Sequence, residues 1–61
     1  MAYTVHVNGT SVSAPLDYTR AWDNYATVTD AIRALSHTEV FAEPVTIQLC
    51  DDSRVLHTTN I

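Results

Sequence analysis

The chain has few of the residues that usually stabilise very small domains. Cys50 is its only cysteine, so no disulfide can form within the chain, and a lone thiol fits a reducing compartment. A domain of 61 residues buries only about 60% of the surface that its unfolded chain exposes. We therefore expect self-association or a tightly bound partner to supply part of the stability.

Lysine is absent, and the positive side chains are three arginines against seven acids, giving a net charge of −4. Because binding to a phosphate backbone depends on clustered cations, this balance disfavours direct binding to nucleic acid or to an anionic membrane. No apolar run approaches the ~18 residues of a membrane span, and the start MAYTVHV lacks the pattern of a signal peptide. We expect one cytoplasmic domain covering residues 1–61.

Glycine is also scarce, since Gly9 is the only one, which excludes a glycine-rich loop that cradles phosphate. The pair Asn8-Gly9 lies between two β-prone runs and predicts a hairpin with a type I′ turn. The two-residue loop sets the expected pairing of Val7 with Thr10, Val5 with Val12, and Tyr3 with Ala14. Apolar side chains then share one face of this hairpin.

Beyond Pro15 the apolar spacing changes to that of a helix. One stripe contains Ala21, Tyr25, Val28, Ile32 and Leu35. We predict a helix over residues 23–36, with Thr27 as one possible N-cap and residues 16–22 then extending the second strand. Asp17 or Thr19 are alternative starts for a longer helix.

The segment SHTEVFAEP predicts a connection that carries two apolar anchors, Val40 and Phe41, and Pro44 prevents the helix from continuing. A second hairpin follows, with Asp52 and Ser53 in the turn. The expected pairs are Leu49 with Leu56, Ile47 with Thr58, and Cys50 with Val55. The sequence therefore predicts an α+β fold of order ββαββ, in which two antiparallel hairpins flank an amphipathic helix packed on one face of the sheet.

Three potential zinc ligands, His6, Cys50 and His57, lie on the outer faces of the two hairpins in this register. Structural zinc sites usually contain close-spaced pairs of ligands, and no such pair exists here. Asp51 and Asp52 follow Cys50, and their negative charge disfavours the thiolate that a nucleophile needs. We expect no enzyme activity, no metal and no cofactor.

The aromatic side chains are a stronger indication of function. Trp22 lies away from the centre of the apolar stripe, and with Tyr18 and Arg20 it would form an exposed patch of the residue types enriched at interface hot spots. In the alternative interpretation, Trp22 covers one end of a small core. The outer strands of the sheet also lack the lysine and proline that commonly block edge pairing, which favours a symmetric homodimer.

The layout YTVHVNGTSVS, then VTDAIRALSH, then PVTIQLCDDSRVLH, resembles the short accessory proteins encoded by bacteriophages, especially those of actinobacteria. The resemblance implies a small early protein that binds and modulates a host or competing protein. It implies no role for any particular residue.

Three hypotheses about function follow. The first is a non-enzymatic protein-interaction module that occupies a surface of a larger protein through Trp22, Tyr18 and Arg20. The second is an inhibitor of a nucleic-acid enzyme, such as an anti-CRISPR or anti-restriction protein, whose carboxylates imitate phosphates. The seven acids available for mimicry are Asp17, Asp23, Asp30, Glu39, Glu43, Asp51 and Asp52. The third is a small metal-binding domain that uses His6, Cys50 and His57.

Overall fold

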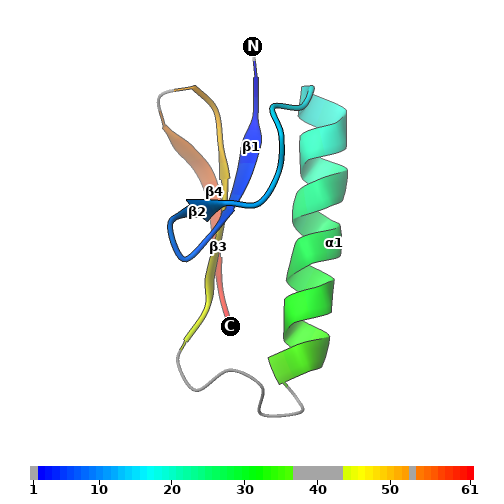
Figure 1. The fold of residues 1–61 in the computed structure, drawn as a ribbon, viewed down its shortest axis with the longest axis vertical. Coiled ribbons are helices and arrows are strands. Elements are labelled where there is room, and N and C mark those ends of the chain that lie inside the picture. The colour runs from blue at the N-terminus through cyan, green and yellow to red at the C-terminus, as the bar shows by residue number, and fades with distance from the viewer. Residues whose placement is uncertain (1, 37–43, 53) are drawn as a thin grey trace.

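One helix lies along one face of an antiparallel four-stranded sheet in the computed structural model (Figure 1). The structure describes residues 2–36, 44–52 and 54–61. The chain order is β1 (Thr4–Val7), β2 (Thr10–Ser11), α1 (Tyr18–Ser36), β3 (Thr46–Cys50) and β4 (Val55–Asn60). This confirms the predicted ββαββ fold.

The two hairpins join through their inner strands, so that the order across the sheet is β2-β1-β3-β4. The sequence left this point open, because local patterns do not show which strands of separate hairpins pair. In the observed register Val5 lies opposite Leu49 and Val7 lies opposite Ile47. Each of these pairs places apolar side chains together beneath α1.

The first turn has the predicted geometry. Asn8 and Gly9 have φ angles of 49° and 84°, the left-handed values that a type I′ turn requires at both positions. The turn also reaches the neighbouring strand, since the Asn8 Oδ1 accepts a hydrogen bond of 2.9 Å from the Thr46 N–H. Asn8 therefore connects the first hairpin to β3.

The prediction that apolar side chains share one face of the first hairpin is wrong beyond Ser11. Val12 is 49% exposed and Ala14 is also exposed, because β2 ends at Ser11. The Val5 N–H donates to the Ser13 Oγ and not to a backbone carbonyl. Tyr3 then pairs with Leu16 instead of Ala14. The detour leaves β2 very short and brings the chain directly to the start of α1.

The helix begins at Tyr18, earlier than the preferred prediction, and the longer alternative that starts at Asp17 is the correct one. The Asp17 Oδ1 accepts a 2.8 Å hydrogen bond from the Arg20 N–H, which is the geometry of an N-cap. Thr27 lies within the helix and is not its cap. The described helix reaches Ser36, and the following residues, including Val40 and Phe41, lie outside the described residues.

The second hairpin contains a β-bulge that the sequence did not predict. Cys50 lies opposite Val55 as expected, but the register then shifts, so that Leu49 lies opposite His57 and not opposite Leu56. An extra residue on one strand turns the following side chains to the other face of the sheet. His57 therefore faces α1.

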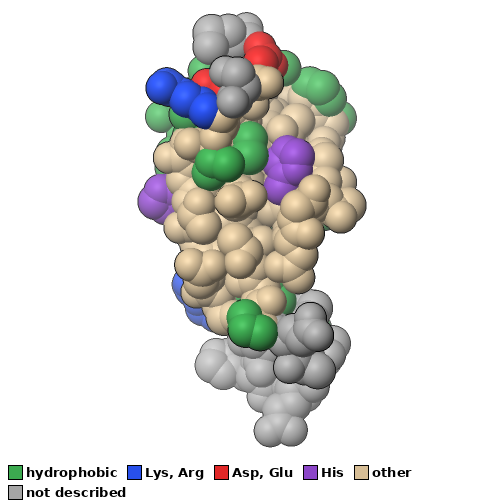
Figure 2. Space-filling model, turned by 90° about the vertical axis from the view of Figure 1, so that its left-hand side faces the viewer, with side chains coloured by type: hydrophobic (Ala, Val, Ile, Leu, Met, Phe, Trp, Pro, Cys, Tyr) green, Lys and Arg blue, Asp and Glu red, His purple; other side chains and the backbone are tan. Residues whose placement is uncertain are grey.

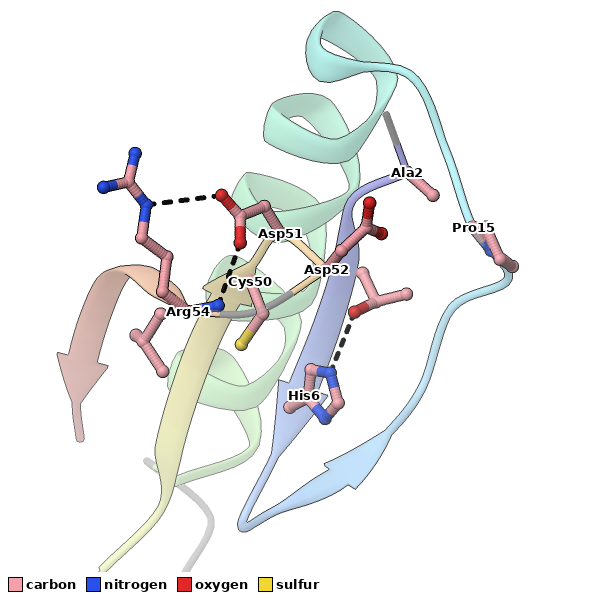
Figure 3. A pocket seen from close by; sticks show the side chains of 9 residues that line it. Ala2, His6, Pro15, Cys50, Asp51, Asp52 and Arg54 are labelled. Carbon is pink, nitrogen blue, oxygen red and sulfur yellow. Dashed lines mark hydrogen bonds and ion pairs between the residues drawn. The ribbon is translucent and has the colours of Figure 1, made fainter.

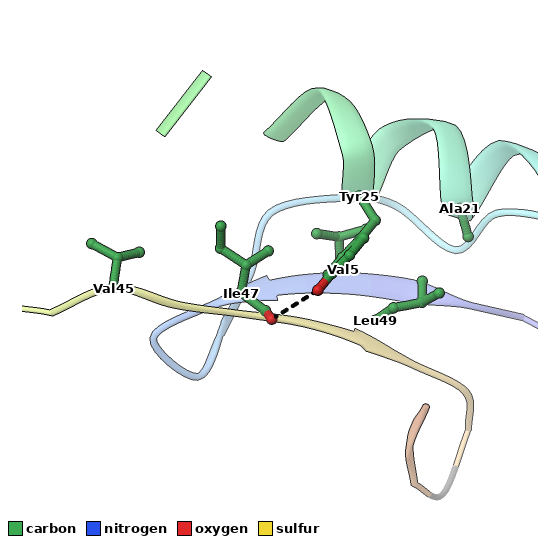
Figure 4. Packing of buried hydrophobic residues seen from close by; sticks show 6 residues of the cluster. All are labelled: Val5, Ala21, Tyr25, Val45, Ile47 and Leu49. Carbon is green, nitrogen blue, oxygen red and sulfur yellow. Dashed lines mark hydrogen bonds between the residues drawn. The ribbon is translucent and has the colours of Figure 1, made fainter. Parts of the chain in front are cut away.

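The core lies between α1 and the two central strands (Figure 4). Leu49 and Ile47 are fully buried, and Tyr25 reaches from the helix to place its hydroxyl 3.5 Å from the Ile47 carbonyl oxygen. The predicted stripe is buried over its first part, although Leu35 at its end is 45% exposed. The buried members are Val5, Ala21, Tyr25, Val45, Ile47 and Leu49.

In the part of the chain that the structure describes, no helix covers the opposite face of the sheet. Figure 2 shows this face as mostly tan, with charged side chains confined to its margins. By the alternation of strand residues, its members are those that lie between the buried positions. None of them is a lysine, an arginine or an acid: Thr4, His6, Ser11, Thr46, Gln48, Cys50, Val55, Thr58 and Asn60.

Candidate functional site

Five rings form a continuous row along one side of the domain, which we call the aromatic row. Its helical members occupy positions on neighbouring turns, so their side chains lie above one another on one side of α1. Tyr3 joins from the residue before β1, and His57 joins from β4 because of the bulge. The aromatic row consists of Tyr3, Tyr18, Trp22, Tyr25 and His57.

The rings along the helix pack edge to face. The ring centroids of Tyr3 and Tyr18 are 5.4 Å apart, those of Tyr18 and Trp22 are 6.2 Å apart, and those of Trp22 and Tyr25 are 5.7 Å apart. The interplanar angles are 73°, 73° and 80° in the same order. T-shaped pairs at such separations are favourable, and each adds roughly 0.5–1.5 kcal/mol to the effect of burial.

His57 connects the aromatic row to β4, at the edge of the sheet. Its imidazole centroid lies 5.4 Å from the Trp22 ring and 5.5 Å from the Tyr25 ring. The sequence prediction missed this residue, because the expected register placed His57 on the outer face. No signal in the strand pattern indicates the bulge that turns it to the helix side of the sheet.

Exposure increases along the helical members of the row, from Tyr25 to Tyr18. Tyr25 is 5% exposed, Trp22 is half-buried and packs against the core, and Tyr18 is 54% exposed. Trp22 therefore combines the two interpretations of the sequence, since it covers the core and also supports the exposed ring of Tyr18. The row presents Tyr18 as an exposed aromatic side chain at this open end, and His57 is also exposed at the edge of the sheet.

The Trp22 indole N–H is buried and has no hydrogen-bond partner among the described residues. A buried donor without a partner costs roughly 1–3 kcal/mol, so this group is a local weakness of the packing. Because the nitrogen atom itself is inaccessible, Trp22 offers a binding partner the surface of its ring and not a hydrogen bond.

Arg20, the third predicted member of the patch, lies on another side of the helix. It is two positions from both Tyr18 and Trp22, which corresponds to about 200° around the helix axis. Its Nε lies 3.8 Å from the Asp17 Oδ2, and it lines a shallow depression with Asp23 and Thr27. The structure brings Tyr18 and Trp22 together and does not place Arg20 with them.

The bulge also separates the three candidate zinc ligands. Cys50 and His6 lie on the uncovered face, but His57 lies on the helix side, so the prediction that they share one surface is wrong. Across residues 2–36, 44–52 and 54–61, no cluster of three histidine, cysteine or acidic side chains is arranged to hold a metal ion.

A shallow pocket of about 470 Å³ opens on the uncovered face near the second turn (Figure 3). Cys50 and His6 line it, and the Thr4 hydroxyl lies 2.9 Å from the His6 Nε2. Burial, and then the neighbouring Asp51 carboxylate, raise the pKa of the Cys50 thiol. The thiol is therefore held in its protonated form, which is the reverse of what an activated nucleophile needs.

The acids do not gather in one place among the described residues. Asp17 and Asp51 each lie beside an arginine, with Asp51 Oδ2 3.3 Å from the Arg54 Nε. Asp23 and Asp30 are exposed on the helix, and Glu39 and Glu43 lie outside the described residues. Pairing with arginine reduces the negative field that phosphate mimicry requires.

Within the described ranges, no helix is long and apolar enough to cross a membrane. Comparisons with protein-family models, with curated proteins and with solved structures found no significant match to this chain.

Proposed function

We propose that this chain is a non-enzymatic protein-interaction domain that docks on a larger protein through the open end of the aromatic row and that also self-associates. The observation that carries the proposal concerns Tyr18. Its side chain is 54% exposed, and its ring packs against the half-buried ring of Trp22. Tyrosine and tryptophan are the residue types most enriched at binding hot spots.

The row is suited to binding because its rings are already ordered. Tyr18 contacts Tyr3 on one side and Trp22 on the other, so its side chain loses little conformational freedom when a partner covers it. Large aromatic side chains with few rotatable bonds supply contact area at a low entropy cost. A partner with an apolar cleft at its surface fits this open end.

In this proposal the partner that binds the open end of the aromatic row is a protein and not a nucleic acid. The chain carries a net charge of −4 and no lysine, and Arg20 and Arg54 lie beside aspartates. Arg20 then acts at the rim, where it contacts only a partner that reaches around α1. The expected role is that of a phage-type modulator, which inhibits a cytoplasmic host protein by occupying its surface.

Affinity capture with matched variants tests the docking surface. Immobilised wild-type protein, Tyr18→Ala and Val12→Ala are exposed to the same bacterial lysate, and retained proteins are quantified by mass spectrometry at low and high salt. Val12 is a suitable control because it is 49% exposed and lies outside the aromatic row. We expect a protein that wild type and Val12→Ala retain at high salt and that Tyr18→Ala loses.

Other results would contradict the proposal. A partner retained equally by all three variants would show that docking uses another surface. A nucleic-acid enzyme that is released by salt would favour the mimicry hypothesis, because screening weakens binding between opposite charges. Tyr18→Ala also removes the ring contacts with Tyr3 and Trp22, so circular dichroism is used to verify that each variant is folded before the retained proteins are compared.

A further inference from the structure

The strand β4 forms one edge of the sheet, and no other strand among the described residues pairs with its outer side. The other edge is β2, which has only the residues Thr10–Ser11, whereas β4 extends over Val55–Asn60. An exposed strand presents a row of backbone donors and acceptors that pair readily with another strand. Pairing through β4 therefore offers the longer ladder.

The hydrogen-bond pattern identifies which groups of β4 point away from the sheet. Val45 and Ile61 form a bonded pair, with N···O distances of 3.2 Å and 2.9 Å. Bonded and non-bonded pairs alternate along an antiparallel ladder, so Thr59 also directs its backbone groups toward β3. The N–H and C=O groups of Thr58 and Asn60 therefore point outward from the edge.

Nothing in the sequence of this edge opposes pairing with a copy of itself. Residues 55–61 read VLHTTNI and contain no lysine, arginine, acid or proline. Natural edge strands are commonly protected by such residues. Because the segment contains no lysine, arginine or acid, two antiparallel copies place no such charges opposite each other.

We infer that a second copy of this chain pairs antiparallel with β4, with the two-fold axis passing beside Thr59. In this register Thr58 lies opposite Asn60 of the partner subunit, and each such pair exchanges both of its N–H···O bonds. The symmetry repeats the pair on the other side of the axis. The two sheets then form one continuous sheet with β4 strands at its centre.

The dimer brings two aromatic rows toward each other. The helix packs mainly on β1 and β3, so two helices are separated by about four strand spacings, or roughly 20 Å. This distance leaves space between them, because a helix with its side chains is about 10–12 Å wide. Trp22 and His57 from both subunits then flank the seam, on the helix side of the joined sheets.

This inference deepens the self-association in the proposed function and rests on it. The first test measures the dimer dissociation constant by sedimentation equilibrium for wild type, Thr58→Pro and Thr58→Val. Proline at position 58 removes an outward N–H and leaves the bonds between β3 and β4 intact. Valine keeps the N–H and the branched side chain. We expect Thr58→Pro to weaken the dimer by at least roughly tenfold, while Thr58→Val changes it little.

A second measurement does not depend on the proline variant folding. Directly opposite residues in a non-bonded pair have Cα atoms about 4.5 Å apart, which suits a disulfide. In a Cys50→Ser background, Thr59→Cys should cross-link the two subunits on mild oxidation. Ser11→Cys in the same background is the matched control on the other edge, and it should not cross-link.

The outcomes separate this inference from the proposal beneath it. Loss of the dimer in Thr58→Pro, together with cross-linking at position 59, supports β4 pairing. A dimer that survives Thr58→Pro, or one that cross-links through position 11 and not through position 59, overturns β4 pairing while self-association stands. A wild-type chain that remains monomeric at every concentration overturns both.

Discussion

The imidazole of His57 packs against the indole of Trp22, with ring centroids 5.4 Å apart and ring planes inclined by 54°. This contact depends on the bulge in β4, which turns His57 toward α1. It joins the aromatic row to the sheet on a side where the helix has few other contacts. Trp22 consequently contributes to the stability of the fold as well as to the surface that supports Tyr18.

Substitution of Trp22 should separate the effects of its ring and its N–H. Trp22→Ala removes contacts with three rings, and we expect it to lower the free energy of unfolding by about 2–3 kcal/mol. Trp22→Phe keeps an aromatic ring and deletes a buried donor that has no partner among the described residues. It should cost about 1 kcal/mol or less.

Urea unfolding of both variants provides the measurement, at a fixed protein concentration because dimerisation changes apparent stability. If Trp22→Phe were as destabilising as Trp22→Ala, the indole nitrogen would contribute to the fold and the account of its burial would be wrong.

Some of the fold could be predicted from the sequence because the signals are local. The Asn8-Gly9 turn requires left-handed backbone at both positions, and few residue pairs tolerate it. The helical stripe through Ala21 and Tyr25 follows directly from the spacing of apolar residues. Neither feature depends on which part of the chain packs against it.

The sequence also predicts the pairing of Tyr18 with Trp22, but the bulge and the place of His57 in the aromatic row could not be predicted in this way. A regular hairpin that pairs Leu49 with Leu56 satisfies the apolar pattern, so the sequence gives no reason to insert an extra residue. In the structure, His57 gains contacts with Trp22 and Tyr25, which belong to a distant element. The choice between these registers is therefore made by tertiary packing, and the contact of His57 with the aromatic row depends on it.

Alanine substitutions of two charged residues at the start of α1, Asp17 and Arg20, should affect stability differently. Asp17 caps the helix through its bond to the Arg20 N–H, so Asp17→Ala should reduce the free energy of unfolding by about 1 kcal/mol. The side chain of Arg20 is 77% exposed and its ion pair spans 3.8 Å. Arg20→Ala should therefore change stability by about 0.5 kcal/mol or less.

Chemical denaturation of Asp17→Ala, Asp17→Ser and Arg20→Ala distinguishes capping from ion pairing. Serine retains a capping oxygen but has no charge, so it should keep most of the stability. An equal loss in Asp17→Ser and Arg20→Ala would assign the effect to the ion pair.

The side chain of Asn8 connects two parts of the sheet, and its contribution can be isolated from the backbone requirement of the turn. Asn8→Gly preserves the positive φ angle and removes only the hydrogen bond to the Thr46 N–H. Asn8→Ala removes the same bond and also strains the turn. We expect Asn8→Gly to cost about 1 kcal/mol and Asn8→Ala to cost about 1 kcal/mol more.

Amide hydrogen exchange at Thr46 gives the local readout, since its N–H loses its partner in both variants. Unchanged protection of this amide in Asn8→Gly would contradict the proposed connection between the hairpin turn and β3.

The pKa of Cys50 predicts slow alkylation that a single neutralising change should accelerate. Burial and the Asp51 carboxylate both raise this pKa, so less thiolate is present at pH 8 than for an ordinary cysteine. Asp51→Asn removes the negative charge but keeps an amide oxygen able to accept the Arg54 N–H. We expect the midpoint of the rate profile to move to lower pH in this variant.

The profile is measured with iodoacetamide between pH 7 and 10, and Asp23→Asn serves as a control because Asp23 is exposed on the helix. A midpoint that Asp51→Asn leaves in place would assign the raised pKa to burial alone.

The hydroxyl groups of Tyr25 and Thr59 are hydrogen-bonded to each other between α1 and β4. The Tyr25 hydroxyl also lies 3.5 Å from the Ile47 carbonyl oxygen. Removing either hydroxyl leaves the other without this partner in a poorly hydrated place, so Tyr25→Phe and Thr59→Val should each cost about 1–2 kcal/mol. Removing both hydroxyls leaves no unpaired group of this pair.

The double variant should therefore be less destabilised than the sum of the single variants, with a coupling of about 1 kcal/mol. Equilibrium unfolding of the four proteins gives this coupling directly, and Tyr18→Phe is the control because the exposed Tyr18 ring leaves its hydroxyl near water. Tyr18→Phe should change stability by about 0.5 kcal/mol or less. Additive losses in the cycle would mean that the two hydroxyls act independently, and the hydrogen bond between helix and edge strand would then contribute nothing to holding α1 over β4.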